Sequence, residues 1–211
     1  MARAVLDLTK DDRITLVAID GVDGAGKTTF ARELAELVEA AGRPVIRASV
    51  DSFHRSRAER YARGRNSAEG FYRDSYDYEL LKASLLDPLS SGSGRFRRAA
   101  FNVESDAPVD SPLEDAVPGS VLIFDGIFLQ RPELRRYWDL SILLDVPWEK
   151  NHHLLNHPEW NAGQSDPSSP QHRYAEGQRI YFRECDPRAA ASIVIDNTDL
   201  SNPIVIKAPK T

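Results

Sequence analysis

The sequence predicts an α/β fold in which a parallel sheet of about five strands carries helices on both faces. Two observations predict it. Short apolar runs recur along the 211 residues and are nearly continuous rather than alternating, as in strands that are covered on both faces. Between these runs lie segments with helical periodicity, and strands that alternate with helices favour a parallel sheet.

The individual strands follow from the positions of these runs. We expect them at residues 14–19, 44–50, 121–124, 141–144 and 192–195, with residues 204–206 as a candidate edge strand. The segment 29–41 predicts an amphipathic helix, because its apolar side chains fall on one stripe with the charges opposite. Gly42 and Pro44 then end that helix.

Composition narrows the class of protein. The formal net charge of −5 gives no electrostatic reason to expect binding to nucleic acid. One cysteine excludes an internal disulfide and suits a reducing compartment, and no apolar run approaches the ~20 residues that span a bilayer. We therefore expect a single cytoplasmic domain over residues 1–211, with small-molecule partners, no membrane and no nucleic acid. The sequence leaves the oligomeric state open.

A glycine-rich motif near the N-terminus is the sequence feature that points most directly to a function. Residues 21–28 read Gly-Val-Asp-Gly-Ala-Gly-Lys-Thr and fit the pattern G-x-x-x-x-G-K-[ST]. The motif directly follows a predicted strand and opens a predicted helix, which favours a phosphate-binding loop (P-loop) over an ordinary glycine-rich turn. The sequence thus predicts the P-loop NTPase fold. The predicted phosphate-binding residues are Gly21, Asp23, Gly24, Ala25, Gly26, Lys27, Thr28 and Thr29.

Each part of this motif has a physical role. The glycines let the backbone fold around a polyphosphate, and the N–H groups of residues 24–28 can point inward at a helix N-terminus. Lys27 is expected to reach the β- and γ-phosphates, and the hydroxyl of Thr28 is expected to bind Mg²⁺. The implied ligand is a nucleoside triphosphate with magnesium.

Two carboxylates follow predicted strands. Asp51 comes after the second apolar run and Asp125 after the third. The carboxyl ends of strands in such a sheet open onto the ligand crevice, so both should lie near the phosphates. One can accept a hydroxyl proton and the other can hold magnesium. The alternative is that both simply cap helices or turns.

Several segments resemble a known family. Residues 50–54 (Val-Asp-Ser-Phe-His), 72–77 (Tyr-Arg-Asp-Ser-Tyr-Asp) and 124–129 (Phe-Asp-Gly-Ile-Phe-Leu) look like the uridine kinase and phosphoribulokinase group of P-loop kinases, in its bacterial uridine kinase-like branch. The resemblance implies phosphorylation of a hydroxyl by ATP with Mg²⁺, often the 5′-hydroxyl of uridine or cytidine. It implies Asp51 as catalytic base beside Lys27, with Thr28 and Asp125 at the metal.

The resemblance also implies binding residues and a lid. His54 and Tyr72 match positions that contact the acceptor, and Asn197 and Thr198 match the surroundings of the adenine. The family's lid carries arginines, yet residues 148–172 here contain none. Arg173, Arg179 and Arg183 are the candidates to serve instead, with a lid segment over about residues 148–180. Arg173 and Arg179 are also expected to contact the acceptor.

Two alternatives stay open at this point. The acceptor could be another nucleoside, pantothenate, or a sugar or sugar phosphate held by the six arginines between residues 55 and 73. The chain could also be a nucleotide-binding module with little catalysis, since its lid is poor in arginine.

Overall fold

A mostly parallel sheet forms the centre of the computed structural model, which describes residues 1–8, 12–92, 94–147, 166 and 169–208. Its six strands lie in the order β10-β9-β8-β1-β7-β2. Five are parallel: β1 (Thr15–Gly21), β2 (Val45–Ser49), β7 (Val121–Gly126), β8 (Leu140–Asp145) and β9 (Ile193–Asp196). The antiparallel edge strand is β10 (Ile204–Lys207). The predicted α/β class and strand positions are confirmed.

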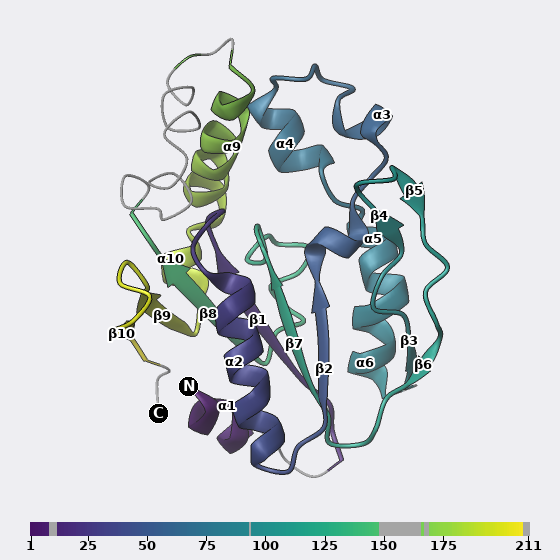
Figure 1. Ribbon diagram of the computed structural model, residues 1–211, viewed down its shortest axis with the longest axis vertical. Helices are drawn as coiled ribbons and strands as arrows, with labels where there is room; N and C mark the ends of the chain where they lie inside the picture. Colours follow the sequence, from purple (N-terminus) through teal and green to yellow (C-terminus); the bar gives the residue numbers. More distant parts are fainter. Residues whose placement is uncertain (9–11, 93, 148–165, 167–168, 209–211) are drawn as a thin grey trace.

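Helices cover both faces of this sheet (Figure 1). Along β1, Val17 and Ile19 pack in one core with α1 (Ala2–Leu8) and α2 (Lys27–Ala40). The intervening Leu16 and Ala18 pack in a second core on the opposite face. That second core takes in side chains from η1 (Val50–Phe53), α4 (Ala68–Asp74), α5 (Tyr78–Leu81), η2 (Lys82–Leu86), α6 (Asp87–Ser91) and α9 (Pro170–Cys185).

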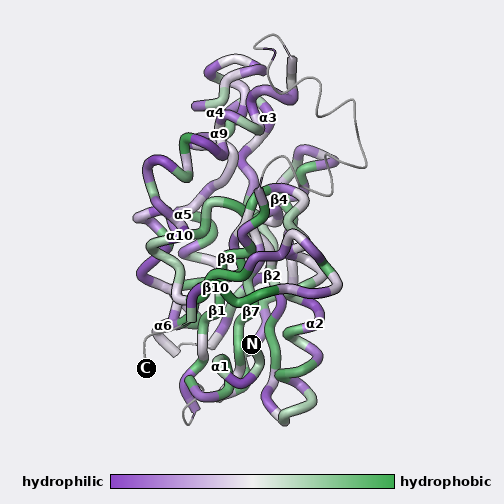
Figure 2. Tube along the Cα trace, turned by 90° about the vertical axis from the view of Figure 1, so that its left-hand side faces the viewer, coloured by the Kyte–Doolittle hydropathy of each residue, from purple (hydrophilic) through white to green (hydrophobic). Residues whose placement is uncertain are grey.

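The remaining elements are short. They are α3 (Arg57–Arg60), α10 (Pro187–Ala190), and two small antiparallel pairs, β3 (Arg95–Phe96) with β6 (Glu114–Asp115) and β4 (Phe101–Asn102) with β5 (Ala107–Pro108). The sequence did not predict these pairs, because a two-residue strand is too short to show a period. Figure 2 shows the hydrophobic central strands and the more hydrophilic end that carries α3 and α4.

The strand register places three chain segments at one edge of the sheet. Asp20 on β1 lies beside Gly126 on β7, and Ser49 on β2 lies beside Asp125 on β7. The segments that leave β1, β2 and β7 therefore diverge from the same edge. Gly126 allows this close approach, since a Cβ there would lie 2.4 Å from Cγ1 of Val50.

The predicted lid falls mostly outside this description. Residues 148–165 and 167–168 are outside the described residues, whereas residues 170–180 belong to α9, which lies beside α4 (Figure 1). Among the described helices, none combines the length and the apolar character that crossing a bilayer requires.

Candidate active site

A cavity of about 390 Å³ lies at this sheet edge. It is lined by six predicted phosphate-binding residues and by both predicted carboxylates: Asp23, Gly24, Gly26, Lys27, Thr28, Thr29, Asp51 and Asp125, with Gly126 and Ile127 completing the wall. Residues predicted from three separate stretches of sequence thus share one cavity. The P-loop supplies one side of it, and the ends of β2 and β7 supply the other.

The P-loop (residues 21–28) connects β1 to α2. Gly26 has φ +85°, in the left-handed region that favours glycine, and α2 begins at the next residue. Nζ of Lys27 donates to the carbonyl of Val22 at 2.8 Å, so the lysine lies folded along the loop. Gly21 and Ala25 are buried and do not line the cavity.

The carboxylate of Asp125 accepts hydrogen bonds from two side chains, one hydroxyl and one guanidinium. The Thr28 hydroxyl donates to its Oδ2 at 3.1 Å, and the Arg47 guanidinium donates to its Oδ1 at 3.2 Å. A threonine hydroxyl beside a carboxylate at a phosphate cavity is the oxygen donor set that Mg²⁺ prefers. The residues present therefore fit a magnesium ion. Arg47, which lies on β2, was not expected from the sequence.

Asp51 lies in η1, directly after β2, and lines the cavity together with the P-loop residues. Its carboxylate accepts a hydrogen bond from the Tyr76 hydroxyl at 3.1 Å. His54 lies next to it, with Nδ1 2.9 Å from the carbonyl oxygen of Asp51. A carbonyl can only accept, so this nitrogen carries the proton. Burial lowers the pKa of His54 below its usual 6.5, which favours the neutral ring.

Helix α9 contacts both the P-loop and the end of β1 that precedes it. Oε1 of Gln178 accepts from the backbone N–H of Asp23 at 2.8 Å, and its Nε2 lies 3.3 Å from Oδ2 of Asp23. One turn further along, the Tyr181 hydroxyl donates to Oδ2 of Asp20 and accepts from the N–H of Gln130 at 2.9 Å.

Asp20 is fully buried at the end of β1. Its other oxygen accepts from the N–H of Gly21 at 2.8 Å. Burial raises the pKa of Asp20 to about 6, against the lowering effects of Tyr181, Gly21 and the Lys27 charge. A titratable carboxyl thus lies directly beneath the loop that is predicted to hold phosphate.

Asn197 also supports the P-loop. Its Nδ2 donates to the carbonyl of Ala25 at 2.8 Å, and a Cβ on Gly26 would lie only 3.1 Å from this nitrogen. Thr198 follows it, with its N–H bonded to Oδ1 of Asp196 at 2.9 Å. Of the two predicted adenine-site residues, Asn197 therefore contacts the loop, and its amide is already used in holding it.

The structure does not bring the other predicted acceptor residues to the cavity. The Tyr72 side chain is buried, and its hydroxyl lies 3.3 Å from Sγ of Cys185. Arg173 is buried against the rings of Tyr61, Phe71 and Tyr174, and donates to the carbonyl of Arg65 at 2.7 Å. Arg179 is exposed and pairs with Glu176.

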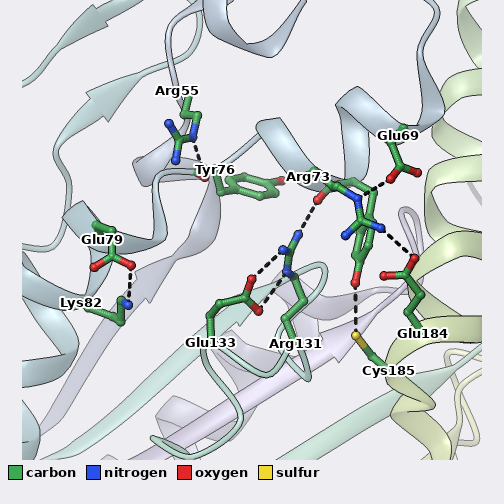
Figure 3. Close-up of polar contacts among 11 residues, drawn as sticks. Arg55, Glu69, Arg73, Tyr76, Glu79, Lys82, Arg131, Glu133, Glu184 and Cys185 are labelled. Atoms are coloured by element: carbon green, nitrogen blue, oxygen red, sulfur yellow. Dashed lines mark hydrogen bonds and ion pairs between the residues drawn. The ribbon is translucent and has the colours of Figure 1, made fainter. Parts of the chain in front are cut away.

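The surroundings of Tyr72 explain its place. Arg131 is buried, donates to the carbonyl of Tyr72 at 2.7 Å and forms an ion pair with Glu133 at 2.7 Å (Figure 3). Arg73 lies between Glu69 on α4 and Glu184 on α9 in the same view. This network joins α4, α9 and the segment after β7, so Tyr72 serves packing rather than the cavity.

The comparisons with known proteins agree with this geometry. The Phosphoribulokinase / Uridine kinase family matches residues 16–151, which is more than half of the chain. Curated thymidylate kinases of Xanthomonas campestris pv. campestris, among them that of strain B100, are 64% identical over 31 residues. That stretch covers 15% of this chain and only 14% of those enzymes, so it shows a local likeness.

Solved structures resemble the chain over most of its length. A structure described as a possible uridine kinase from Bacillus stearothermophilus has a TM-score of 0.73 and 25% identity, and covers 92% of this chain and 95% of its own. A putative fructose transport system kinase from Silicibacter sp. TM1040 has a TM-score of 0.63 and 24% identity, with coverages of 85% and 92%. D-glycerate 3-kinase from Cryptococcus neoformans shares the fold alone, at a TM-score of 0.58 and 12% identity, covering 97% and 95%.

Proposed function

Since the chain belongs to the phosphoribulokinase/uridine kinase family, we propose that it transfers the γ-phosphate of ATP to the hydroxyl of a small uncharged acceptor, with the 5′-hydroxyl of uridine or cytidine as the first choice. One observation carries the proposal. Asp51 lines the same cavity as Lys27 and Thr28, so a base and a phosphate-binding loop face one space.

The transfer needs little covalent chemistry from the protein. The acceptor oxygen attacks the γ-phosphorus, the bond from that phosphorus to the ADP oxygen breaks, and ADP leaves with the electron pair. Asp51 takes the proton that the acceptor hydroxyl loses. Lys27 and the backbone N–H groups of the P-loop neutralise the phosphate oxygens. A nucleotide-binding module would have no use for a carboxylate at the position of Asp51.

Magnesium would be held by Thr28 and Asp125, whose oxygens lie 3.1 Å apart beside the loop. When bound, it would neutralise charge that develops on the β- and γ-phosphates. The guanidinium of Arg47 donates to the other oxygen of Asp125, Oδ1, and so helps to orient that carboxylate.

The charges around the arginine-rich stretch favour an uncharged acceptor. Four of its six arginines have acidic partners: Arg55 with Glu59, Arg60 with Asp106, Arg63 with Asp74, and Arg73 with Glu69 and Glu184. A guanidinium that is already paired attracts an anion less strongly. This arrangement supports a nucleoside more than a sugar phosphate.

The test is ADP release with Mg-ATP and a panel of uridine, cytidine, other nucleosides, pantothenate and sugar phosphates. We expect uridine or cytidine to stimulate release, and Asp51→Asn to lower stimulated turnover by at least ~10²-fold while ATP binding is kept. Asp77→Asn is the matched control, because Asp77 caps α5 through Leu80 and asparagine caps as well.

Each outcome decides something. Stimulation by a different panel member would keep the role of Asp51 and overturn the pyrimidine nucleoside. Unchanged turnover in Asp51→Asn would overturn the role of Asp51. ATP binding with no stimulated release by any acceptor would favour the nucleotide-binding module.

A further inference from the structure

The carboxylate of Asp51 has one side-chain partner among the described residues, the hydroxyl of Tyr76, which donates to its Oδ1 at 3.1 Å. We propose that Tyr76 is a positioning residue for Asp51: it fixes Oδ1 and leaves Oδ2 to receive the proton of the acceptor. This inference rests on the proposed function, because it assigns a role toward the base of that reaction.

The backbone holds Tyr76 in register with the segment that carries Asp51. The N–H of Asp77 donates to the carbonyl of Phe53 at 2.8 Å, and the N–H of Arg55 donates to the carbonyl of Ser75 at 3.0 Å. His54 and Tyr76 form an isolated antiparallel bridge between these two bonds. The Arg55 side chain adds a bond to the carbonyl of Tyr76 at 3.2 Å (Figure 3). Tyr76 therefore keeps its place relative to Asp51.

The ring of Tyr76 is buried and packs against three aromatic neighbours. It is 4% exposed, and its centroid lies 4.5 Å from that of His54, 6.2 Å from Tyr78 and 6.5 Å from Phe128. A ring packed in this way has few rotamers available, so its hydroxyl is delivered to one point. Burial and the nearby Asp51 and Asp23 charges raise the pKa of Tyr76 well above its usual 10, so the phenol keeps its proton and acts as a donor.

The consequence concerns the geometry of the base. Asp51 is exposed and lies in the short 3-10 helix η1. Without a partner, an exposed aspartate side chain would rotate between several orientations. A donor fixed on one oxygen selects one orientation, and the second oxygen then has a defined direction. A base that is already oriented loses less entropy on reaching the transition state.

The experiment compares Tyr76→Phe with Tyr78→Phe in the full chain, using Mg-ATP and uridine. Tyr78 is a matched control, because it is a buried neighbouring tyrosine whose hydroxyl has no hydrogen-bond partner among the described residues. We expect Tyr76→Phe to lower kcat roughly tenfold, as for loss of a hydrogen bond to a charged group, with the KM for ATP within about twofold. We expect Tyr78→Phe to keep kcat within about twofold of the starting protein.

A double-mutant comparison separates positioning from packing. In an Asp51→Asn background, Tyr76→Phe should change the residual turnover by less than about twofold, because the base it orients is gone. Equal losses in both backgrounds would overturn the inference and assign Tyr76 to packing. So would a Tyr76→Phe enzyme with unchanged kcat while Asp51→Asn is impaired.

Failure of the proposed function gives a different result. If Asp51→Asn itself retains full turnover, the proposed base is wrong, whatever Tyr76→Phe does. If the protein does not phosphorylate uridine, the same four variants are compared in the slow hydrolysis of ATP, where water takes the place of the acceptor hydroxyl. We then expect Tyr76→Phe to lower the rate of ATP hydrolysis roughly tenfold in the otherwise unmodified chain, and to leave that rate nearly unchanged in the Asp51→Asn background.

Discussion

Replacing Asp20 by asparagine should change the stability of the protein in a way that depends on pH. The stability of Asp20→Asn, measured relative to that of the unmodified chain, should be higher at neutral pH than at acidic pH. Asp20 is fully buried, and burial raises its pKa from 3.8 to about 6. Its folded form therefore binds a proton more tightly than its unfolded form. The stability that this carboxyl contributes is complete below pH 3.8 and is lost as the pH rises through about 6.

The size of the effect follows from the shift. A shift of about two pKa units corresponds to roughly 3 kcal/mol of unfolding free energy, lost between about pH 4 and pH 7. Asparagine does not titrate, so Asp20→Asn removes this loss. The change also alters the hydrogen bond from Tyr181. The part of that bond that depends on the charge of Asp20 is already contained in its pKa, and the part that does not depend on pH cancels when two pH values are compared.

Urea unfolding of both proteins at about pH 5 and about pH 8 measures this difference. We expect the stability of Asp20→Asn relative to the unmodified chain to rise by about 1–3 kcal/mol between the two pH values. Asp7→Asn, at an exposed aspartate of α1, serves as the control for the same substitution at the surface. A relative stability that stays constant or falls with pH would refute the assignment of Asp20 as a carboxyl that resists ionisation.

Two further predictions concern the walls of the cavity. Gly126→Ala should destabilise the fold by roughly 1–3 kcal/mol in urea unfolding, because the added Cβ would lie 2.4 Å from Cγ1 of Val50; a loss below about 0.5 kcal/mol would show that Val50 moves aside. Asn197→Ala should weaken ATP binding up to roughly tenfold, since the buried carbonyl of Ala25 loses its donor. Isothermal titration with Mg-ATP measures this, and an affinity equal to that of the unmodified protein would contradict it.

The parts of the site that the sequence predicted are encoded locally. The P-loop is one continuous stretch, and Asp51 and Asp125 each follow an apolar run that forms a strand. Because the carboxyl ends of parallel strands meet at one edge of the sheet, these residues can be predicted to lie close together. The helix expected at residues 29–41 begins two residues earlier, at Lys27, because the P-loop passes directly into it.

The contacts that support the site could not be predicted in this way. Tyr76 is 25 residues from Asp51, Gln178 is 155 residues from Asp23, and Tyr181 is 161 residues from Asp20. No local pattern links such pairs. The packing of α9 brings Gln178 and Tyr181 to their partners, and the backbone bridge between His54 and Tyr76 brings Tyr76 to Asp51.

Arg173 and Tyr72 are buried and do not line the cavity, for a related reason. In a sequence, an arginine is expected to lie at the surface as a cation. Stacking on the rings of Tyr61 and Tyr174 nevertheless allows the guanidinium of Arg173 to be buried. Tyr72 is likewise held in the core by its neighbours on α9 and after β7.

Two contacts of α9 bear on how firmly that helix keeps its position. Gln178 bonds to Asp23 in the P-loop, and Tyr181 bonds to Asp20 at the end of β1, directly before the loop. If the loop holds ATP as proposed, we expect a loosening of α9 that frees the loop to weaken ATP binding by some factor. Reciprocity requires bound ATP to oppose that loosening by the same factor. Slower amide hydrogen exchange along α9 on addition of nucleotide would be the visible sign of this mutual reinforcement.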